Sequence, residues 1–301
     1  MSSRGRRWFA APPVTTGTDR LREGELSAEP AMFPGVRPAR TMFAGLFGEL
    51  AFHPRPDIVG ERLEDAYSLF HARSAAMGWL TPAQEGATGG LWGMNDAEAA
   101  PALGQQPQRV ASFQVMLTGP VPGNLPPVQP FLACASDVVA RLGTLRLDAV
   151  QVLLPERDPP EEETPASPSG LRVAWPLVDA LNWFSDCDPR LRASVRVTLD
   201  GGADPSIHAA APAILQWAQE VCQDVFVPES LSLADEDHLI LRPIPFEDPA
   251  HDAVHHRVTF RGTLAEWSLD ALGWLAAFFA EANSRHGVNT RLMLTADRIV
   301  T

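Results

Sequence analysis

The amino-acid sequence predicts an α+β fold, in which a mixed or antiparallel β-sheet is covered by helices packed mainly on one face. The 301 residues are 45% hydrophobic, which is enough for a packed core. From residue 109 onward, strand-like and helix-like patterns alternate along the chain. Residues 190–199 alternate strictly between apolar and polar side chains, as a half-buried strand does. A doubly wound parallel sheet is the alternative fold, but its strands would be nearly continuous apolar runs.

The first 108 residues are expected to contribute little to the sheet. Residues 1–40 hold five prolines among glycine, threonine and arginine, a composition typical of a flexible tail. Residues 41–108 are predicted to be a helical and loop segment. Its helix covers residues 57–77, where apolar side chains recur at helical spacing after Asp57, a candidate N-cap. Residues 82–108 are rich in glycine, alanine and glutamine and are predicted to be loop.

Residues 109–156 are predicted to form a first α/β half. A strand over residues 109–118 precedes a helix over residues 128–142, and a second strand covers residues 145–154. Gly143 occupies the position at which a glycine commonly ends a helix.

Residues 171–301 are predicted to form a second α/β half, after an acidic, proline-rich segment at 157–170 that we expect to be a solvated linker. The predicted helices cover residues 176–184, 207–226 and 268–285, and the predicted strands cover residues 190–199, 238–242, 256–262 and 290–295. The two halves are expected to be similar plaits. Residues 175–183 resemble residues 267–274, and each stretch precedes a strand that contains arginine, which suggests a duplicated helix–strand unit.

The composition excludes several kinds of function. All 24 basic residues are arginine, so the lysine of a Walker phosphate loop or of a pyridoxal Schiff base is missing. The three cysteines are far apart, which argues against a disulfide framework or a zinc site. No apolar run follows residues 1–7 and none is long enough to span a membrane, so we expect a cytoplasmic protein without membrane contact. The net charge of −13 argues against nucleic acid as a partner.

Arginines on the polar sides of two predicted strands form the candidate ligand-binding site. Arg192 and Arg196 lie on the polar side of one strand, and Arg257 and Arg261 on that of another. Guanidinium groups bind carboxylates and phosphates through paired hydrogen bonds, so these residues are suited to hold an anionic small molecule. The alternative is that they are ordinary surface residues, each paired with a neighbouring aspartate or glutamate.

His255 and His256 are the acid–base candidates beside these arginines. They end the densest histidine cluster of the chain, at residues 248–256. A metal site is not predicted there, because Pro249 and the following strand make the segment a loop and a third and fourth ligand are missing. No cofactor is expected, because the chain has no complete cofactor-binding motif.

Five tryptophans lie on or beside predicted helices, namely Trp175, Trp183, Trp217, Trp267 and Trp274. Most are expected to pack the helices on the sheet, and the alternative role is to anchor a partner surface. No complete catalytic constellation is present. The sequence therefore favours a non-catalytic cytoplasmic binding or assembly protein with an acidic surface, of immunity or accessory type, whose protein partner is basic. The alternative is an enzyme or small-molecule binder that holds an anionic ligand on the arginine-rich sheet face.

Overall fold

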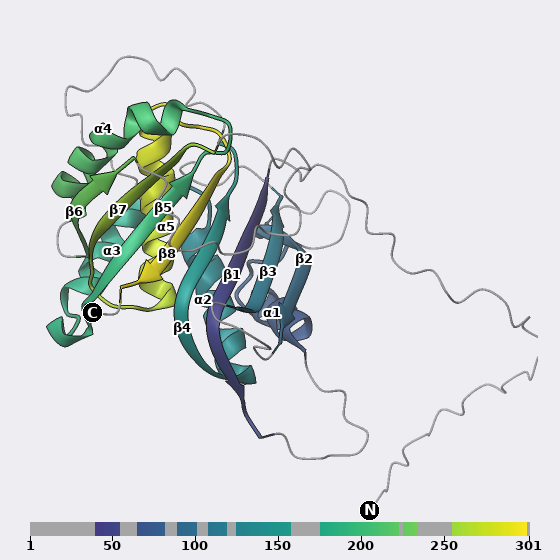
Figure 1. Cartoon of the computed structure of the whole chain (residues 1–301). Helices are drawn as coiled ribbons and strands as arrows, with labels where there is room; N and C mark the ends of the chain where they lie inside the picture. Colours follow the sequence, from purple (N-terminus) through teal and green to yellow (C-terminus); the bar gives the residue numbers. More distant parts are fainter. Residues whose placement is uncertain are drawn as a thin grey trace, which may run out of the picture. The chain divides into compact units, whose positions relative to one another are not determined.

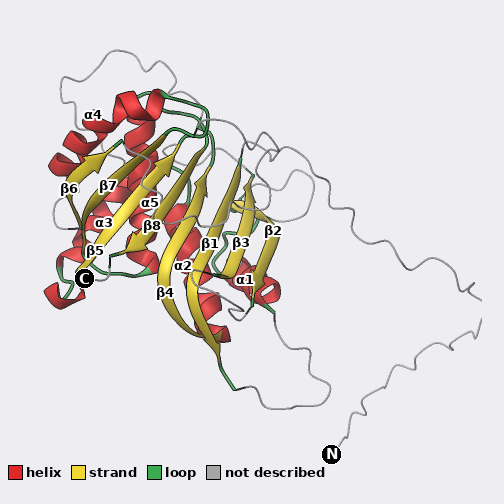
Figure 2. Cartoon of the chain, viewed as in Figure 1, coloured by secondary structure: helices red, strands yellow, loops and turns green. Residues whose placement is uncertain are grey.

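The computed structural model of the chain describes residues 40–54, 65–81, 89–100, 108–118, 125–157, 175–222, 225–233 and 255–299. Within these residues, eight strands form one antiparallel sheet and the helices pack on one of its faces, which confirms the predicted α+β fold (Figures 1 and 2). The strands are β1 (Thr41–Phe52), β2 (Trp92–Ala99), β3 (Arg109–Leu117), β4 (Gly143–Leu154), β5 (Ala193–Asp200), β6 (Phe226–Ser232), β7 (Arg257–Leu264) and β8 (Leu292–Arg298). The helices are α1 (Ala66–Ala76), α2 (Val128–Leu142), α3 (Trp175–Ser185), α4 (Ser206–Val221) and α5 (Leu269–Arg285), with a short 3₁₀ helix, η2 (Pro189–Leu191). In the described part of the chain, no helix is both long and apolar enough to cross a membrane.

The sheet consists of two halves that share one topology. The first half runs β1-α1-β2-β3-α2-β4 along the chain, and its strands lie side by side in the order β2-β3-β1-β4. The second half runs β5-α4-β6-β7-α5-β8, and its strands lie in the matching order β6-β7-β5-β8. Each half is therefore a split β-α-β plait. The first half begins at Thr41 rather than at residue 109, because β1 is one of its two central strands.

The repeated unit differs from the one that the sequence suggested. Helix α3 connects the halves and has no counterpart in the first half, whereas α5 corresponds to α2. The likeness between residues 175–183 and 267–274 therefore joins helices that are not equivalent, and that interpretation is wrong. The two helices pack on each other, with the indole nitrogen of Trp274 donating to the carbonyl of Leu177 at 3.0 Å.

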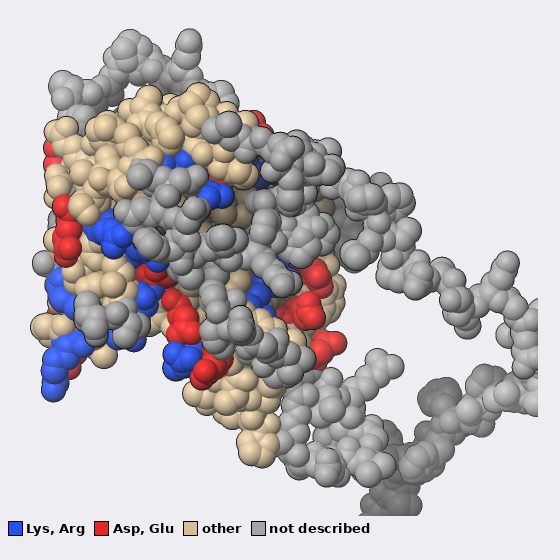
Figure 3. All heavy atoms as spheres, in the orientation of Figure 1, with Lys and Arg blue, Asp and Glu red and all other residues tan. Residues whose placement is uncertain are grey.

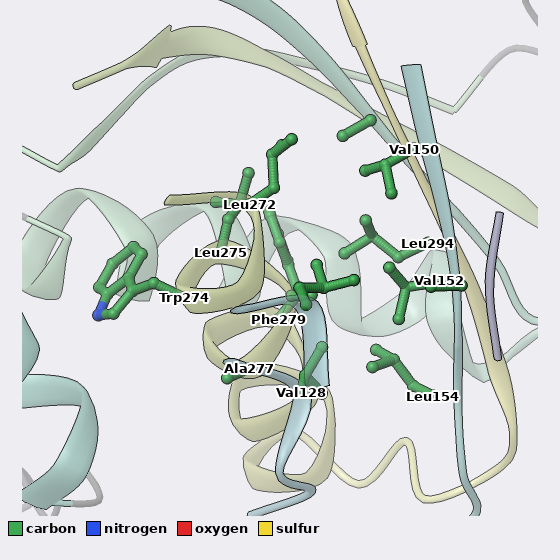
Figure 4. Packing of buried hydrophobic residues seen from close by; sticks show 14 of the residues in the cluster. Val128, Val150, Val152, Leu154, Leu272, Trp274, Leu275, Ala277, Phe279 and Leu294 are labelled. Carbon is green, nitrogen blue, oxygen red and sulfur yellow. The ribbon is translucent and has the colours of Figure 1, made fainter. Parts of the chain in front are cut away.

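One hydrophobic core extends across the seam between the halves, where β4 pairs with β8. Figure 4 shows Val150 and Val152 of β4 and Leu294 of β8 on the side of the sheet that Phe279 of helix α5 faces. Residues on the two strands alternate, so the side chains between these face the other side of the sheet. The core thus fixes which face of each strand is left for polar residues.

Helices α2 and α5 meet closely at the same seam. A Cβ atom at Gly273 of α5 would lie 3.0 Å from the Cα of Gln129 in α2, so a glycine is what permits this approach. A polar contact also crosses the seam, because the indole nitrogen of Trp267 donates to the carbonyl of Leu147 at 2.8 Å. The two plaits are therefore joined through the sheet, the helical layer and a hydrogen bond.

The described end of the predicted linker belongs to the fold. The Arg157 guanidinium donates to the carbonyl of Ala280 at 3.0 Å and to the carboxylate of Glu281 at 3.1 Å, and the Arg157 side chain is only 12% exposed. Arg157 therefore ties the end of β4 to the end of α5. The expectations for residues 158–170 and for residues 1–39 lie outside the described residues.

The expectation of a helical and loop segment over residues 41–108 is wrong for two stretches that form strands. In β1 nearly every residue is buried, so the apolar run lacks the alternation that marks a half-buried strand. Strand β2 lies at the edge of the sheet, and a register shift between Met94 and Asp96 interrupts the period of two in its sequence WGMNDAEA. Neither strand therefore shows a continuous period of two in its hydrophobic residues.

Helix α1 confirms part of the helix that was predicted over residues 57–77. It begins at Ala66, and its N-cap is Asp65, whose carboxylate accepts the backbone N–H of Ser68 at 2.7 Å. Residues 55–64, including the proposed cap Asp57, lie outside the described residues.

One predicted helix of the second half also needs correction at its end. The helix expected over residues 207–226 ends at Val221, and Phe226 begins strand β6. Strand β6 lies at the edge of the sheet and contains Pro228, which lacks the N–H that an inner strand would need. The strand expected over residues 238–242 lies outside the part of the chain that the structure describes.

Candidate functional site

Three of the four predicted ligand-binding arginines lie on one face of the second half. Val195 and Val197 of β5 belong to the core under the helices, so Arg196 between them faces the other side of the sheet. The strand register places Arg196 directly opposite Arg261 of β7 on one side and opposite Asp297 of β8 on the other. We call this side, away from the helices, the second face.

Arg196 is held by a carboxylate of the same face. Its Nε donates to Oδ1 of Asp297 at 3.0 Å, and its Nη2 donates to Oδ2 at 2.8 Å. The two side chains are 14% and 9% exposed, so this bidentate pair is largely removed from water. Its geometry is the one in which guanidinium and carboxylate groups bind most strongly. The Arg196 guanidinium therefore acts mainly within the fold.

Arg257 and His255 converge on a second carboxylate, that of Asp200 at the end of β5. Arg257 Nε donates to Oδ2 at 2.8 Å, and His255 Nδ1 lies 3.0 Å from Oδ2 and 3.1 Å from Oδ1. The backbone N–H of Gly202 donates to Oδ1 at 2.8 Å. The His255 side chain is 36% exposed and that of Arg257 37%. His255, Asp200 and Arg257 thus form one polar cluster at the end of β5.

His256 does not join this cluster. Its backbone N–H donates to the carbonyl of Gly202 at 2.8 Å, and its ring packs edge-on against His208, with ring centroids 5.0 Å apart. His208 in turn contacts the carbonyl of Arg257 through Nε2 at 2.9 Å. Successive residues of an extended chain point to opposite sides, which separates His256 from His255. The described geometry assigns His256 to the loop that closes this end of the strands.

Arg192 also lies apart from the other candidates. The strand expected from residue 190 begins at Ala193, because residues 189–191 form η2, which Asp188 caps by accepting the backbone N–H of Arg190. Arg192 therefore lies before the start of β5, whereas Asp200 and its partners lie at the end of β5. The structure therefore does not bring the four predicted arginines together in one ligand site.

Carboxylates accompany the arginines on the second face. Figure 3, viewed as in Figure 1, shows arginine side chains interspersed with acidic ones rather than gathered in one basic field. The expectation of a cationic face is wrong in this respect, because Asp200 and Asp297 occupy positions on the same face as Arg196. Both aspartates follow the strand alternation of the arginines. The sequence already contains this signal, because Asp200 and Asp297 occupy polar positions of the strand pattern, where acidic residues could have been counted beside the arginines.

Burial raises the pKa of each of the three cysteine thiols. Burial raises the pKa of the Cys134 thiol to about 11, and burial raises the pKa of Cys222 well above its usual value. Burial and then the nearby carboxylate of Glu266 raise the pKa of Cys187. Because the thiolate is the nucleophile, these thiols fit structural positions.

The tryptophans divide into buried and exposed ones. Trp217 and Trp274 are buried in the helical layer, and Trp267 packs against the core. Trp183 on α3, in contrast, is 70% exposed, and Leu191 of η2 is 54% exposed. We call the exposed residues from Trp183 to Leu191, at the turn between α3 and η2, the Trp183 corner. The side chain of Trp175 lies outside the described residues.

No group of three or more histidine, cysteine, aspartate or glutamate side chains is placed to hold a metal ion among the residues that the structure describes. No protein-family model, curated protein or solved structure matches the chain.

Proposed function

We propose that this chain is a non-catalytic cytoplasmic binding or assembly protein, of immunity or accessory type, that contacts its partner through the Trp183 corner. The observation that supports this proposal is the 70% exposure of Trp183 on helix α3, where Leu177 and Phe184 are buried. Tryptophan is enriched among residues that dominate binding energy at interfaces. Exposing an indole and a leucine side chain to water costs free energy, which a partner recovers by covering them.

The proposed partner is a basic protein. The chain has 37 acidic residues against 24 arginines, and this excess attracts a positively charged partner and steers its approach. The described residues hold 14 arginines and 18 acidic residues, so most of the excess lies in the sequence outside them. We propose that long-range attraction comes from the whole chain, whereas the apolar contact comes from the Trp183 corner.

The proposal predicts that one basic protein co-purifies with the tagged chain from its native cells and dissociates as salt is raised. Trp183→Ser and Leu191→Ser should each reduce the amount captured at low salt, since each removes apolar contact area. Tyr67→Ser is the matched control, because Tyr67 is an exposed aromatic residue on α1 in the other half. Equal capture by all variants, or a captured protein of acidic composition, would contradict the proposal.

The second candidate is an enzyme or small-molecule binder that holds an anionic ligand on the second face. The observation that favours it is the contact between His255 and Asp200, which sequence reasoning did not predict. In this candidate Arg257 and Arg261 hold the ligand, and Arg196 supports the face through Asp297. Titration with inorganic phosphate, followed by calorimetry, tests it, because Arg261→Gln should weaken any binding that depends on this face.

A further inference from the structure

Two hydrogen-bond donors other than His255 hold the carboxylate of Asp200. The backbone N–H of Gly202 donates to one of its oxygens at 2.8 Å, and the Nε–H of Arg257 donates to the other at 2.8 Å. Both oxygens of the Asp200 carboxylate thus accept a hydrogen bond from an N–H group, and the side chain is mostly buried, with 17% exposed.

An ionised carboxylate decides which ring nitrogen of His255 carries the proton. Because Asp200 has no proton to donate, Nδ1 at 3.0 Å from Oδ2 must be the donor. In the neutral ring the other nitrogen, Nε2, then holds a lone pair. Both hydrogen bonds of His255 with described residues use Nδ1, and 36% of the side chain is exposed. Nε2 is thus the basic atom of an oriented imidazole.

We propose that His255 and Asp200 form an acid–base dyad, in which Nε2 of His255 takes a proton from a hydroxyl group of a bound small molecule. The proton moves from the ligand oxygen to Nε2, the ring becomes an imidazolium, and the Asp200 carboxylate stabilises that charge. The proton returns from Nε2 to the ligand oxygen, so the transfer is balanced and no other reactant is consumed. Asp200 is a positioning residue, which keeps the ring in one tautomer and one orientation.

The inference deepens the second candidate function and rests on it for the nature of the ligand. Arg257 and Arg261 follow His255 on the same side of β7, at steps of two residues. Between them lies Thr259, whose hydroxyl is 3.1 Å from that of Thr198 on β5. Guanidinium groups suit an anionic group of a ligand, and Nε2 of His255 suits a hydroxyl group of the same ligand, so we assign the site to a small hydroxyl-bearing anion.

The other described histidines provide internal controls. His208 has its Nε2 on the carbonyl of Arg257, and His53 has its Nε2 on the carbonyl of Ala140 at 3.1 Å. The Nε2 of His286 is buried. His71 is exposed on α1 and serves as the reference for an ordinary surface imidazole. Only an oriented, accessible Nε2 should exceed His71 in reactivity.

Nitrogen-15 NMR of the full chain, labelled at histidine, tests the tautomer in the unsubstituted protein. At slightly alkaline pH, neutral His255 should be in the Nδ1–H form, with the signal assigned by its loss in His255→Gln. A predominant Nε2–H form of His255 would overturn the inference, because the lone pair would then face Asp200.

Modification by diethyl pyrocarbonate tests the reactivity of the same atom. Nε2 attacks a carbonyl carbon of the reagent, ethyl carbonate leaves and decomposes to ethanol and carbon dioxide, and the Nδ1 proton is released. Peptide mass spectrometry should show that His255 reacts faster than His71 and that Asp200→Asn loses this advantage. Reaction of His255 at the His71 rate in the unmodified sequence would contradict the dyad. Failure of phosphate to bind would instead remove only the anionic ligand of the second candidate, so the two failures are distinguishable.

Discussion

Replacing Asp297 with alanine is expected to lower the free energy of unfolding by about 3 to 5 kcal/mol, the range for removing one partner of a buried ion pair. The reason is that Arg196, 14% exposed, would keep its charge in a place with little water and no longer meet the carboxylate that it contacts at 2.8 and 3.0 Å. Urea unfolding followed by circular dichroism measures the change.

Two control variants test whether the stability loss of Asp297→Ala arises from a buried ion pair. A double substitution, Arg196→Met with Asp297→Leu, removes both charges and should recover most of the stability. Glu49→Ala removes the partner of Arg146 in a pair whose side chains are 58% and 60% exposed, and it should change stability little. A small loss for Asp297→Ala would show that the arginine is solvated and available to a ligand.

Trp274→Ala is expected to lower the free energy of unfolding by about 3 to 5 kcal/mol, as large-to-small substitutions of buried aromatic residues do. Trp274 is fully buried, stacks on Phe278 at 5.5 Å and packs edge-on against Phe184 of α3 at 6.5 Å. It also supplies the hydrogen bond to the carbonyl of Leu177. Thermal and urea unfolding measure the loss, and binding through the Trp183 corner should weaken as α3 loosens.

The controls for Trp274 use a smaller change and a second tryptophan. Trp274→Phe keeps most of the ring packing but leaves the Leu177 carbonyl without its indole donor, so it should cost about 1 to 3 kcal/mol. Trp183→Ala on the same helical layer should leave stability unchanged, because Trp183 is 70% exposed. Comparable losses for the two alanine variants would contradict the division between a core tryptophan and a surface one.

The elements that were predicted correctly are those whose one-sided burial leaves a periodic pattern of hydrophobic residues in the sequence. Strand β5 is buried on one side only, so its alternation was readable, and helix α5 was placed within a residue of its observed ends. Gly143 ends α2 as expected, and a Cβ there would overlap the carbonyl oxygen of Ala51. Strand β1 escaped prediction because burial on both faces erases the period of two. Long-range strand pairing, which joins residues far apart in sequence, has no local signature.

The sequence predicted which residues belong to the candidate site, but not which carboxylates its arginines contact. Alternation correctly placed Arg196 and Arg261 on the side of the sheet opposite the helices. The partners of Arg196 and Arg257 lie 101 and 57 residues away along the chain, and only the strand register shows that they meet. Exposure is likewise a tertiary property, so the pattern that placed Trp183 and Trp274 on helices did not separate them.

The most direct test of the account is site-specific photo-cross-linking in the native cells. Trp183→p-benzoylphenylalanine places the reactive group in the Trp183 corner, Tyr67→p-benzoylphenylalanine places it on α1, and Ser194→p-benzoylphenylalanine places it on the exposed second face of β5. The account predicts one basic protein cross-linked from position 183, and no such product from position 67 or 194. The same product from position 194 but not from position 183 would contradict it, because the arginine-bearing face would then be the partner surface.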